Sequence, residues 1–265
     1  VYYNDVLENK YYYNSYNELI EEKDYVLNVI VKYYYDTQGN LLKKSKYNLN
    51  NYDLIEVKKY KYEDKNWVDK LTEYNGKKII YDSIGNPISI GKNIQLNWTN
   101  GRQLYNYSDS NQNINYKYNI DGIRISKKIN GKETKFYLEG NDVIFEKTGD
   151  DVLYYIRSTM DGLVGFKYND DIYYYIKNAQ DDIIGILDSN YNLVAKYKYD
   201  AWGKIISITN GAGADVSMNM THIANINPFR YKSYYYDKEI KLYYLGSRYY
   251  NPEWGRFINA DGHIY

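Results

Sequence analysis

One short pattern recurs along the chain and constrains what it can fold into. An aromatic residue is followed by Asp, and Gly comes three residues after the Asp. The three clearest copies are Tyr35-Asp36-Thr37-Gln38-Gly39, Tyr81-Asp82-Ser83-Ile84-Gly85 and Tyr199-Asp200-Ala201-Trp202-Gly203. An Asp side chain that opens a turn can bond the backbone of that turn, and Gly adopts the left-handed conformation that the chain then needs. The pattern therefore predicts a series of tight turns.

The spacing of the turns predicts what lies between them. The aromatic residues that precede the turns are between 17 residues apart (81 to 98) and 24 residues apart (175 to 199). They are Tyr62, Tyr81, Trp98, Tyr118, Tyr137, Tyr155, Tyr175 and Tyr199. A period of about twenty residues is one β-hairpin with its two turns. Because a lone hairpin is marginal in water, successive hairpins must pair, and we expect an all-β fold: a long antiparallel sheet of repeated hairpins with few or no helices.

The choice of aromatic residue adds a second constraint. The chain of 265 residues has 39 Tyr but only 5 Phe. An AT-rich genome would enrich Lys and Tyr, but it would also enrich Phe, so codon bias does not explain this ratio. Tyr alternates with Lys in segments such as Tyr116-Lys117-Tyr118, which puts the rings on one face of a strand and the lysine on the other. We infer that one face of the sheet requires rings that carry a hydroxyl.

Charge and composition argue against several classes of function. Lys and Arg number 34, as do Asp and Glu, and a net charge of zero argues against a broad contact with nucleic acid or an anionic membrane. The absence of Cys excludes disulfide scaffolds and thiol catalysis. His222 and His263 are too few and too far apart in sequence to indicate a metal centre, and we expect no metal and no cofactor. No apolar run of 18 residues is present to span a membrane, and the first residues lack the features of a signal peptide, so we interpret them as an internal cut from a longer protein.

The end of the sequence differs in character from the rest. Residues 210–215 read Asn-Gly-Ala-Gly-Ala-Asp, which is a flexible break. We therefore expect a hairpin-repeat region over residues 1–209 and a separate C-terminal segment over residues 210–265. Residues 216–225 are the one stretch that we consider for a short helix, and Asn227-Pro228 would end it, because the residue before Pro avoids helical geometry.

Beyond Pro228 the sequence is rich in aromatic residues and arginine. Arg230, Arg248 and Arg256 are half of the six arginines in the chain. A guanidinium group can stack on an aromatic ring and pair with a carboxylate at the same time. We expect the three arginines to form a structural clamp with neighbouring tyrosines and with carboxylates of the same segment, namely Asp237, Glu239 or Glu253.

Together these features resemble the YD-repeat (RHS) family. The short Tyr-Asp-x-x-Gly signature recurs over residues 33–205, and the C-terminal segment is similar to the RHS repeat-associated core. The resemblance of that segment is carried by Phe229-Arg230-Tyr231, Tyr236-Asp237, Leu242-Tyr243-Tyr244, Arg248-Tyr249-Tyr250, Pro252, Gly255-Arg256-Phe257 and Asp261-Gly262. These motifs occur in the order and spacing of the family's core.

The resemblance implies a fold and a function. It implies a sheet that spirals into a hollow shell, with the C-terminal segment sealing one end. The residues that the resemblance gives a structural role in that segment are Phe229, Tyr231, Asp237, Tyr244, Arg248, Tyr249, Tyr250, Pro252, Gly255 and Phe257. In the family, such a shell belongs to a secreted bacterial toxin and encloses and delivers a C-terminal toxic effector, as in competition between bacteria. By this resemblance the partners are the protein's own effector and further shell segments or a delivery apparatus, and the protein is secreted or lies at the cell surface.

The resemblance also implies a self-cleavage activity. Asp261 would act in an aspartyl-type cleavage that frees the effector, and Arg256 or Arg230 would lower the pKa of Asp261 by charge pairing. The alternative is that Asp261 opens a turn with Gly262, which this dipeptide favours by itself. We favour the turn, because the proline that the family has after this Asp is missing and the scissile bond would lie beyond the chain. At most, then, the chain contributes an autoproteolytic core, and we expect no other enzymatic activity.

A binding function stays open as the alternative. Tyr rows interleaved with Lys could stack on carbohydrate or single-stranded nucleic acid, and a sheet that binds carbohydrate would suit a cell-surface adhesion module. The same rings would also stabilise a sheet through cross-strand aromatic pairs, and the regular period and zero net charge favour that interpretation. Asp150-Asp151 and Asp181-Asp182 do not indicate a glycosidase, because adjacent strand residues point to opposite faces. We therefore expect a structural shell segment.

Overall fold

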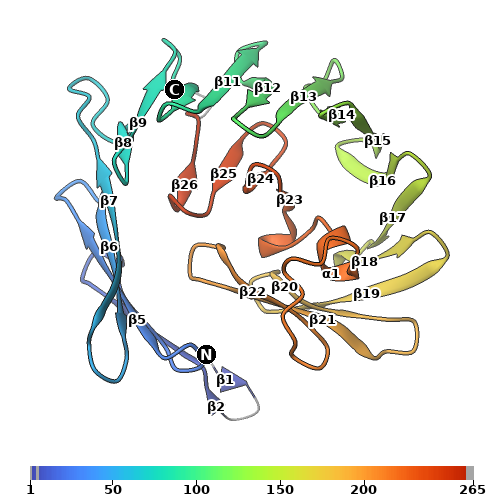
Figure 1. The fold of residues 1–265 in the computed structure, drawn as a ribbon, viewed down its shortest axis with the longest axis horizontal. Coiled ribbons are helices and arrows are strands. Elements are labelled where there is room, and N and C mark those ends of the chain that lie inside the picture. The colour runs from blue at the N-terminus through green and yellow to red at the C-terminus, as the bar shows by residue number, and fades with distance from the viewer. Residues whose placement is uncertain (1, 4–5, 261–265) are drawn as a thin grey trace. The chain divides into compact units, whose positions relative to one another are not determined.

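The computed structural model describes residues 2–3 and 6–260, and it is almost entirely β (Figure 1). Strands hold 54% of the residues and helices 3%, which confirms the all-β expectation. Two compact units are distinguished: residues 1–80 with 89–93, and residues 81–88 with 94–265. The expected boundary at residue 210 stays a prediction. Within the described ranges, no helix has the length and apolarity that a membrane crossing requires.

The first unit consists of short antiparallel strands that follow one another in the chain. They are β1 (Tyr2–Tyr3), β2 (Val6–Leu7), β3 (Asn9–Tyr13), β4 (Leu19–Asp24), β5 (Val29–Tyr35), β6 (Leu41–Asn48), β7 (Leu54–Lys61), β8 (Glu73–Tyr74) and β9 (Lys77–Tyr81). β1 pairs with β2, and the strands from β3 to β9 pair in chain order. The side chains of Ile30, Tyr33 and Tyr60 are among those buried here.

The second unit contains a longer sheet of the same kind. After β10 (Pro87–Ile90), each strand from β11 to β22 pairs antiparallel with the next. These strands are β11 (Ile94–Thr99), β12 (Gln103–Ser108), β13 (Asn113–Tyr118), β14 (Arg124–Ile129), β15 (Lys132–Glu139), β16 (Asp142–Thr148), β17 (Asp151–Ser158), β18 (Gly162–Tyr168), β19 (Asp171–Lys177), β20 (Ile183–Leu187), β21 (Leu193–Tyr199) and β22 (Ile205–Asn210). Phe166, Ile183, Ile186 and Ala195 are fully buried in its core.

The predicted turns are present where the pattern places them. The backbone N–H groups of Gln38 and Asn40 donate to the Asp36 carboxylate, and Gly39 has a φ of 83°. Asp82 and Asp200 open turns with the same two hydrogen bonds, and Gly follows three residues later at positive φ. Asn replaces Asp in further five-residue turns, at Asn14, Asn119, Asn178 and Asn210. Each turn is therefore specified by side-chain bonds within five residues.

At several turns the preceding aromatic residue uses a hydrogen-bond donor that Phe lacks. Tyr199 donates its hydroxyl to the carbonyl of Ile183 at 2.7 Å, and Ile183 directly follows the earlier turn at residues 178–182. Tyr35 and Tyr118 reach backbone carbonyls in the same way, at 2.8 Å each. Trp98 donates its indole N–H to the Pro87 carbonyl at 2.7 Å. A Phe ring cannot donate, so linking one hairpin to an earlier one requires a hydroxyl or an indole.

The remainder of the second unit, residues 211–260, forms a distinct segment that we call the tail. It contains α1 (Ile223–Ile226), the 3-10 helix η1 (Tyr231–Ser233) and a small antiparallel sheet of β23 (Tyr235–Asp237), β24 (Leu242–Tyr244), β25 (Tyr249–Asn251) and β26 (Arg256–Phe257). Figure 1 shows these red strands on one side of the β11–β22 sheet.

The helix of the tail is shorter than the stretch 216–225 that we considered. α1 begins only after His222, whose Nδ1 accepts a hydrogen bond from the Ala224 N–H, and it ends before Pro228 as expected. The segment before it forms turns instead, because the Asn219 side chain bonds the backbone N–H of Thr221 and competes with helical bonds.

Candidate functional site

A cluster of buried charges joins the tail to the sheet. It consists of Arg124 and Lys127 in β14, Glu146 in β16, Asp237 in β23 and Glu239 just after it, and we call it the tail lock. Arg124 pairs with Asp237, and the two side chains are 2% and 0% exposed. Lys127 Nζ lies 3.0 Å from both Asp237 Oδ1 and Glu239 Oε2. Residues more than 100 positions apart are thus held together in the interior.

The surroundings of the tail lock shift the pKa values of Asp237 and Glu146 in opposite directions. Burial by itself would raise the pKa of the Asp237 carboxyl, but Arg124 and Lys127 outweigh it and hold this pKa below its usual value. Burial raises the pKa of Glu146, and the nearby charge of Lys127 and a 2.9 Å hydrogen bond from the Tyr235 hydroxyl only partly offset it. Breaking one partner of such a pair leaves an uncompensated buried charge, which strongly destabilises a fold.

Arg124 is the central cation of the tail lock, and no sequence motif indicated it. Its guanidinium lies 4.2 Å from the centre of the Tyr244 ring and 5.0 Å from that of Tyr235, both in the tail. Of the three carboxylates expected to pair with the arginines of the tail, Asp237 pairs instead with Arg124 and Lys127 of the sheet. Arginine is rare in this lysine-rich chain, and that rarity is the sequence signal that could have drawn attention to Arg124. Arg102, a second arginine of the sheet, also reaches the tail and donates to the carbonyl of Ala260 at 2.9 Å.

Arg230 is buried and stacks as expected. Its guanidinium lies 5.1 Å from the centre of the Tyr197 ring and 5.3 Å from that of Tyr236. It donates to the carbonyls of Ala224 and Asn227 at 3.1 and 3.4 Å. Arg230 therefore ties α1 and the following loop to strand β21, which is a structural role.

Phe229 and Tyr231 flank Arg230 and pack against different parts of the sheet. Phe229 is buried and meets Tyr155 edge-on, with ring centres 4.8 Å apart. Tyr231 lies against the turn at Gly203, where a Cβ would approach the Tyr231 ring to 2.3 Å, so only Gly fits there. The backbone carbonyl of Arg230 itself accepts from the Ile183 N–H at 3.1 Å.

The tyrosines of β24 and β25 bond to the sheet through their hydroxyls. Tyr244 accepts from the Arg124 N–H at 3.1 Å, and the Tyr249 hydroxyl lies 3.3 Å from that of Tyr118. Tyr250 donates to the carbonyl of Trp202 at 2.9 Å. The rings that the resemblance marked in this segment are therefore brought together at the interface between tail and sheet.

The last part of the tail closes over the turn at Trp202. Arg248 stacks on Phe257, at 3.8 Å from the ring centre. Pro252 is buried in a turn opened by Asn251, whose Oδ1 accepts from the backbone N–H groups of the two residues after Pro252. Gly255 has a φ of 69°, and a Cβ there would lie 2.8 Å from the Trp202 ring. These contacts explain why the motif needs Gly at this position.

Only two of the three residues expected to carry self-cleavage, Arg230 and Arg256, lie among the described residues. Asp261 and Gly262 lie outside the described residues. Arg256 lies in β26 opposite Asn251, and Arg230 is engaged with α1. Self-cleavage stays a prediction.

Comparison with known proteins gives short sequence matches. No family model matches the chain. A segment of 76 residues, 29% of the chain, is 42% identical to the tRNA nuclease WapA of Bacillus subtilis (strain 168). The tRNA3(Ser)-specific nuclease WapA of Bacillus spizizenii matches over the same length at 41% identity. The match covers 3% of the length of each WapA protein.

Comparison with solved structures gives matches over nearly the whole chain. A crystal structure of TcdB2-TccC3-Cdc42 superimposes on 96% of this chain with a TM-score of 0.73 at 18% identity, and the match covers 14% of that chain. The chain has an RHS-like fold. The Tc holotoxin pore of Photorhabdus luminescens gives a TM-score of 0.68 at 17% identity over the same shares of the two chains. At such identities the likeness concerns the fold alone.

Proposed function

We propose that this chain is a segment of a β-sheet shell in a secreted bacterial toxin, and that the shell encloses and delivers a C-terminal effector. The observation that carries the proposal is the tail lock, which fixes the tail to one face of the sheet by buried charges. A shell that keeps an enclosed polypeptide apart from solvent needs a terminal segment that stays bound to the sheet. A buried ion pair that is costly to break supplies that property.

The comparisons support this proposal from two sides. The fold is like that of Tc toxin chains, and one stretch of sequence is similar to nucleases named for their action on tRNA. The tyrosine-rich face adds a physical argument, because rings with hydroxyls offer contact area while staying compatible with water. In this proposal residues 1–209 are shell, residues 210–265 are the end plug, and the protein acts outside the producing cell or at its surface.

The test uses the gene's full reading frame, expressed with its natural downstream sequence. We expect the polypeptide that follows the tail to co-purify with the sheet and to resist an added protease. In the Asp237→Asn variant the tail lock is broken, and the same polypeptide should become sensitive to protease. An Asp150→Asn variant, which removes an exposed carboxylate that is not part of the tail lock, is the matched control and should behave like wild type. A downstream polypeptide that is fully digested in the wild type would contradict the proposal.

The same preparation tests self-cleavage separately. If Asp261 acts as the resemblance implies, the full-length product is split beyond the tail and Asp261→Asn keeps it intact. An intact wild-type product removes the autoproteolytic hypothesis and leaves the shell proposal standing.

A further inference from the structure

The face of the sheet that points away from the tail carries a row of stacked aromatic rings, which we call the ring ladder. It consists of Tyr137 in β15, Phe145 in β16 and Tyr154 in β17, which lie directly opposite one another across the strands. The ring centres of Tyr137 and Phe145 are 4.0 Å apart and their planes differ by 10°, while the centres of Phe145 and Tyr154 are 5.0 Å apart. Successive residues of a strand point to opposite faces, so the ring ladder faces away from Phe136 and Tyr155, whose rings contact the tail.

The two ends of the ring ladder are open. Tyr137 and Tyr154 are 41% and 47% exposed, and among the described residues each of them stacks on Phe145 and on no other ring. A further planar ring can therefore stack on either end and extend the ladder. Nucleic-acid bases are planar rings of this kind, and every base can stack on an aromatic side chain whatever the sequence.

A row of exposed lysines, which we call the lysine row, runs beside the ring ladder on the same face. Lys135 lies two residues before Tyr137 and directly opposite Lys147. Lys117 continues the row, because Ser126 lies opposite both Lys117 and Lys135. In the part of the chain that the structure describes, none of the three lysines makes an ion pair. Like charges that lie opposite each other destabilise a sheet, so stabilisation of the sheet does not explain the lysine row.

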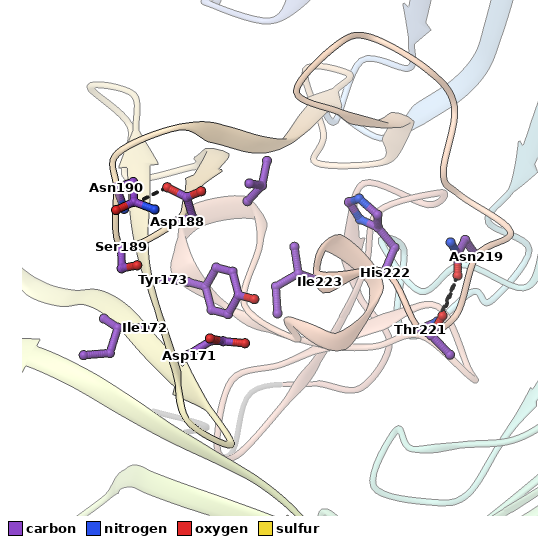
Figure 2. Close-up of a pocket in the computed structure, with 11 residues that line it drawn as sticks. Asp171, Ile172, Tyr173, Asp188, Ser189, Asn190, Asn219, Thr221, His222 and Ile223 are labelled. Atoms are coloured by element: carbon purple, nitrogen blue, oxygen red, sulfur yellow. Dashed lines mark hydrogen bonds between the residues drawn. The ribbon is translucent and has the colours of Figure 1, made fainter.

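Acidic side chains limit how far this face suits an anion. Lys167, which lies opposite Tyr154, pairs with Asp170 at 3.5 Å. Beyond it, Asp171 and Asp188 line a surface pocket at the start of β19, and the described residues around that pocket include neither Lys nor Arg (Figure 2). An anionic chain is therefore expected over β13–β17 and not over β19.

We propose that the ring ladder and the lysine row bind single-stranded nucleic acid. The ammonium groups contact phosphates, while unpaired bases stack on the open ends of the ladder at Tyr137 and Tyr154. The two rows are two residues apart along the strands, or about 7 Å, so one nucleotide can reach both. The net charge of zero argues against a broad contact with nucleic acid, but the lysine row is a local excess of positive charge.

Two other polyanions fit this face less well. A duplex keeps its bases stacked inside and offers only its phosphates to the lysine row. An acidic polypeptide also uses the lysine row but leaves the open ends of the ring ladder without a partner. The inference concerns the face that the tail does not contact, and it does not depend on the proposed function.

The experiment measures the fluorescence anisotropy of labelled oligonucleotides of about 12 nucleotides, a length within the site sizes of single-strand binding proteins, as the full chain is added. The probes are oligo(dT) and oligo(U), and the comparison ligands are a DNA duplex of the same length and poly-glutamate. We expect at least one single strand to bind more tightly than the duplex and to be displaced only weakly by poly-glutamate. The single strand that binds more tightly shows whether DNA or RNA is preferred.

Substitutions separate the two parts of the site. Replacing Lys135 and Lys147 together by Gln should weaken binding about tenfold or more. Between about 50 and about 200 mM salt, it should also reduce the slope of log affinity against log salt by about 1.4, or about 0.7 for each lost phosphate contact. Tyr154→Leu should weaken binding about fivefold or more, because one base loses its stacking partner. It should leave the slope unchanged, since stacking releases no counterions.

The matched controls lie in the first unit. Lys43 and Lys59 are a second pair of lysines directly opposite each other, and Tyr52 is 55% exposed. Replacing both lysines by Gln, or Tyr52 by Leu, should leave binding unchanged. All the substituted side chains are exposed or half-buried, and circular dichroism checks that the variants fold. The proposal is overturned if neither single strand binds, if the controls weaken binding as much as the ladder and lysine-row variants, or if the duplex or poly-glutamate binds as well as a single strand.

Discussion

The two units build similar tyrosine-rich hairpins but surround the rings with different cations. In the first unit the rings meet lysines: Lys43 Nζ lies 3.8 Å from the centre of the Tyr34 ring, and Tyr34 is 39% exposed. Lys10 and Lys23 similarly face the ring of Tyr12. In the second unit the guanidinium of Arg124, 2% exposed, stacks on rings of the tail.

The difference shows that the hairpin itself does not decide whether its tyrosines are exposed to water or buried. The lysines of the first unit keep their strongly hydrated ammonium groups near water, whereas in the second unit Arg124 and Lys127 are both buried because a carboxylate accompanies them. In the second unit the tail brings that carboxylate, Asp237, and covers the face. Substitutions matched between the two units test this difference, and we order them by decreasing size of the expected change.

Removing the carboxylate of the tail lock should destabilise the second unit most. Asp237→Asn leaves Arg124 and Lys127 with excess buried positive charge, and we expect a loss of about 3–5 kcal/mol in the free energy of unfolding. Glu56→Gln in the first unit breaks an ion pair with Lys58 in which Glu56 is 45% exposed, and it should cost less than about 1 kcal/mol. Urea denaturation measures both. Equal losses would mean that the tail lock is no stronger than a surface pair.

Adding a methyl group at Gly255 should have the next largest effect. The Cβ of Gly255→Ala would press on the Trp202 ring at positive φ, and we expect a loss of about 2–3 kcal/mol. Gly76 in the first unit has a φ of 80°, and no atom lies within 4 Å of the place that a Cβ would take, so Gly76→Ala should cost only about 1 kcal/mol of backbone strain. Thermal unfolding compares the two variants. If Gly76→Ala is the more damaging, packing of the tail on Trp202 contributes little.

Removing a single linking hydroxyl should cost about 1 kcal/mol in either unit. Tyr199→Phe deprives the buried Ile183 of its partner, and Tyr35→Phe does the same to Leu19 in the first unit. The larger loss is expected at Tyr199, because Ile183 is 0% exposed and water cannot replace the lost donor as readily. Chemical denaturation of both variants checks this order. Two neutral substitutions would refute a structural need for the hydroxyl.

The smallest expected change is in how the free energy of unfolding depends on pH. The raised pKa of Glu146 means that its contribution to stability is present at low pH and is lost as pH rises through that pKa. Asp237 acts in the opposite sense. Because its pKa is lowered, Asp237 stabilises the fold at pH values above the usual carboxyl pKa, and this stabilisation is lost in acid. Glu146→Gln should therefore reduce the decline in the free energy of unfolding as pH rises above the usual carboxyl range.

The control for this prediction lies in the first unit. Glu22 is also buried and accepts from a tyrosine, Tyr33, at 2.9 Å. Denaturation at several pH values should show whether Glu146→Gln and Glu22→Gln change the pH profile alike. An unchanged profile in Glu146→Gln would show that this carboxyl does not titrate in the range tested.

Much of the sheet could be predicted because its signals are local. Asp200 and Gly203 specify their turn through bonds within five residues, and the position of Tyr199 before the turn marks the strand end. The predicted extent of the helix was wrong, because the Asn219 side chain accepts a hydrogen bond from the Thr221 N–H and diverts the backbone from a helix. Neither sequence periodicity nor composition reveals this bond. A surface pocket at Tyr173 was also missed, because the residues that line it lie far apart in the sequence and no motif connects them.

The order of residues is enough to specify the all-β fold, the places of the turns and the need for tyrosine at the hairpin ends. These depend on backbone geometry and on donors a few residues or one hairpin away. Asp237 pairs with Arg124, which lies 113 positions away in the sequence, and the tail thereby buries one face of the sheet. Only the tertiary structure determines this contact. The stability of a buried charge depends on which groups surround it in space, and the spacing of residues in the chain carries no rule for that.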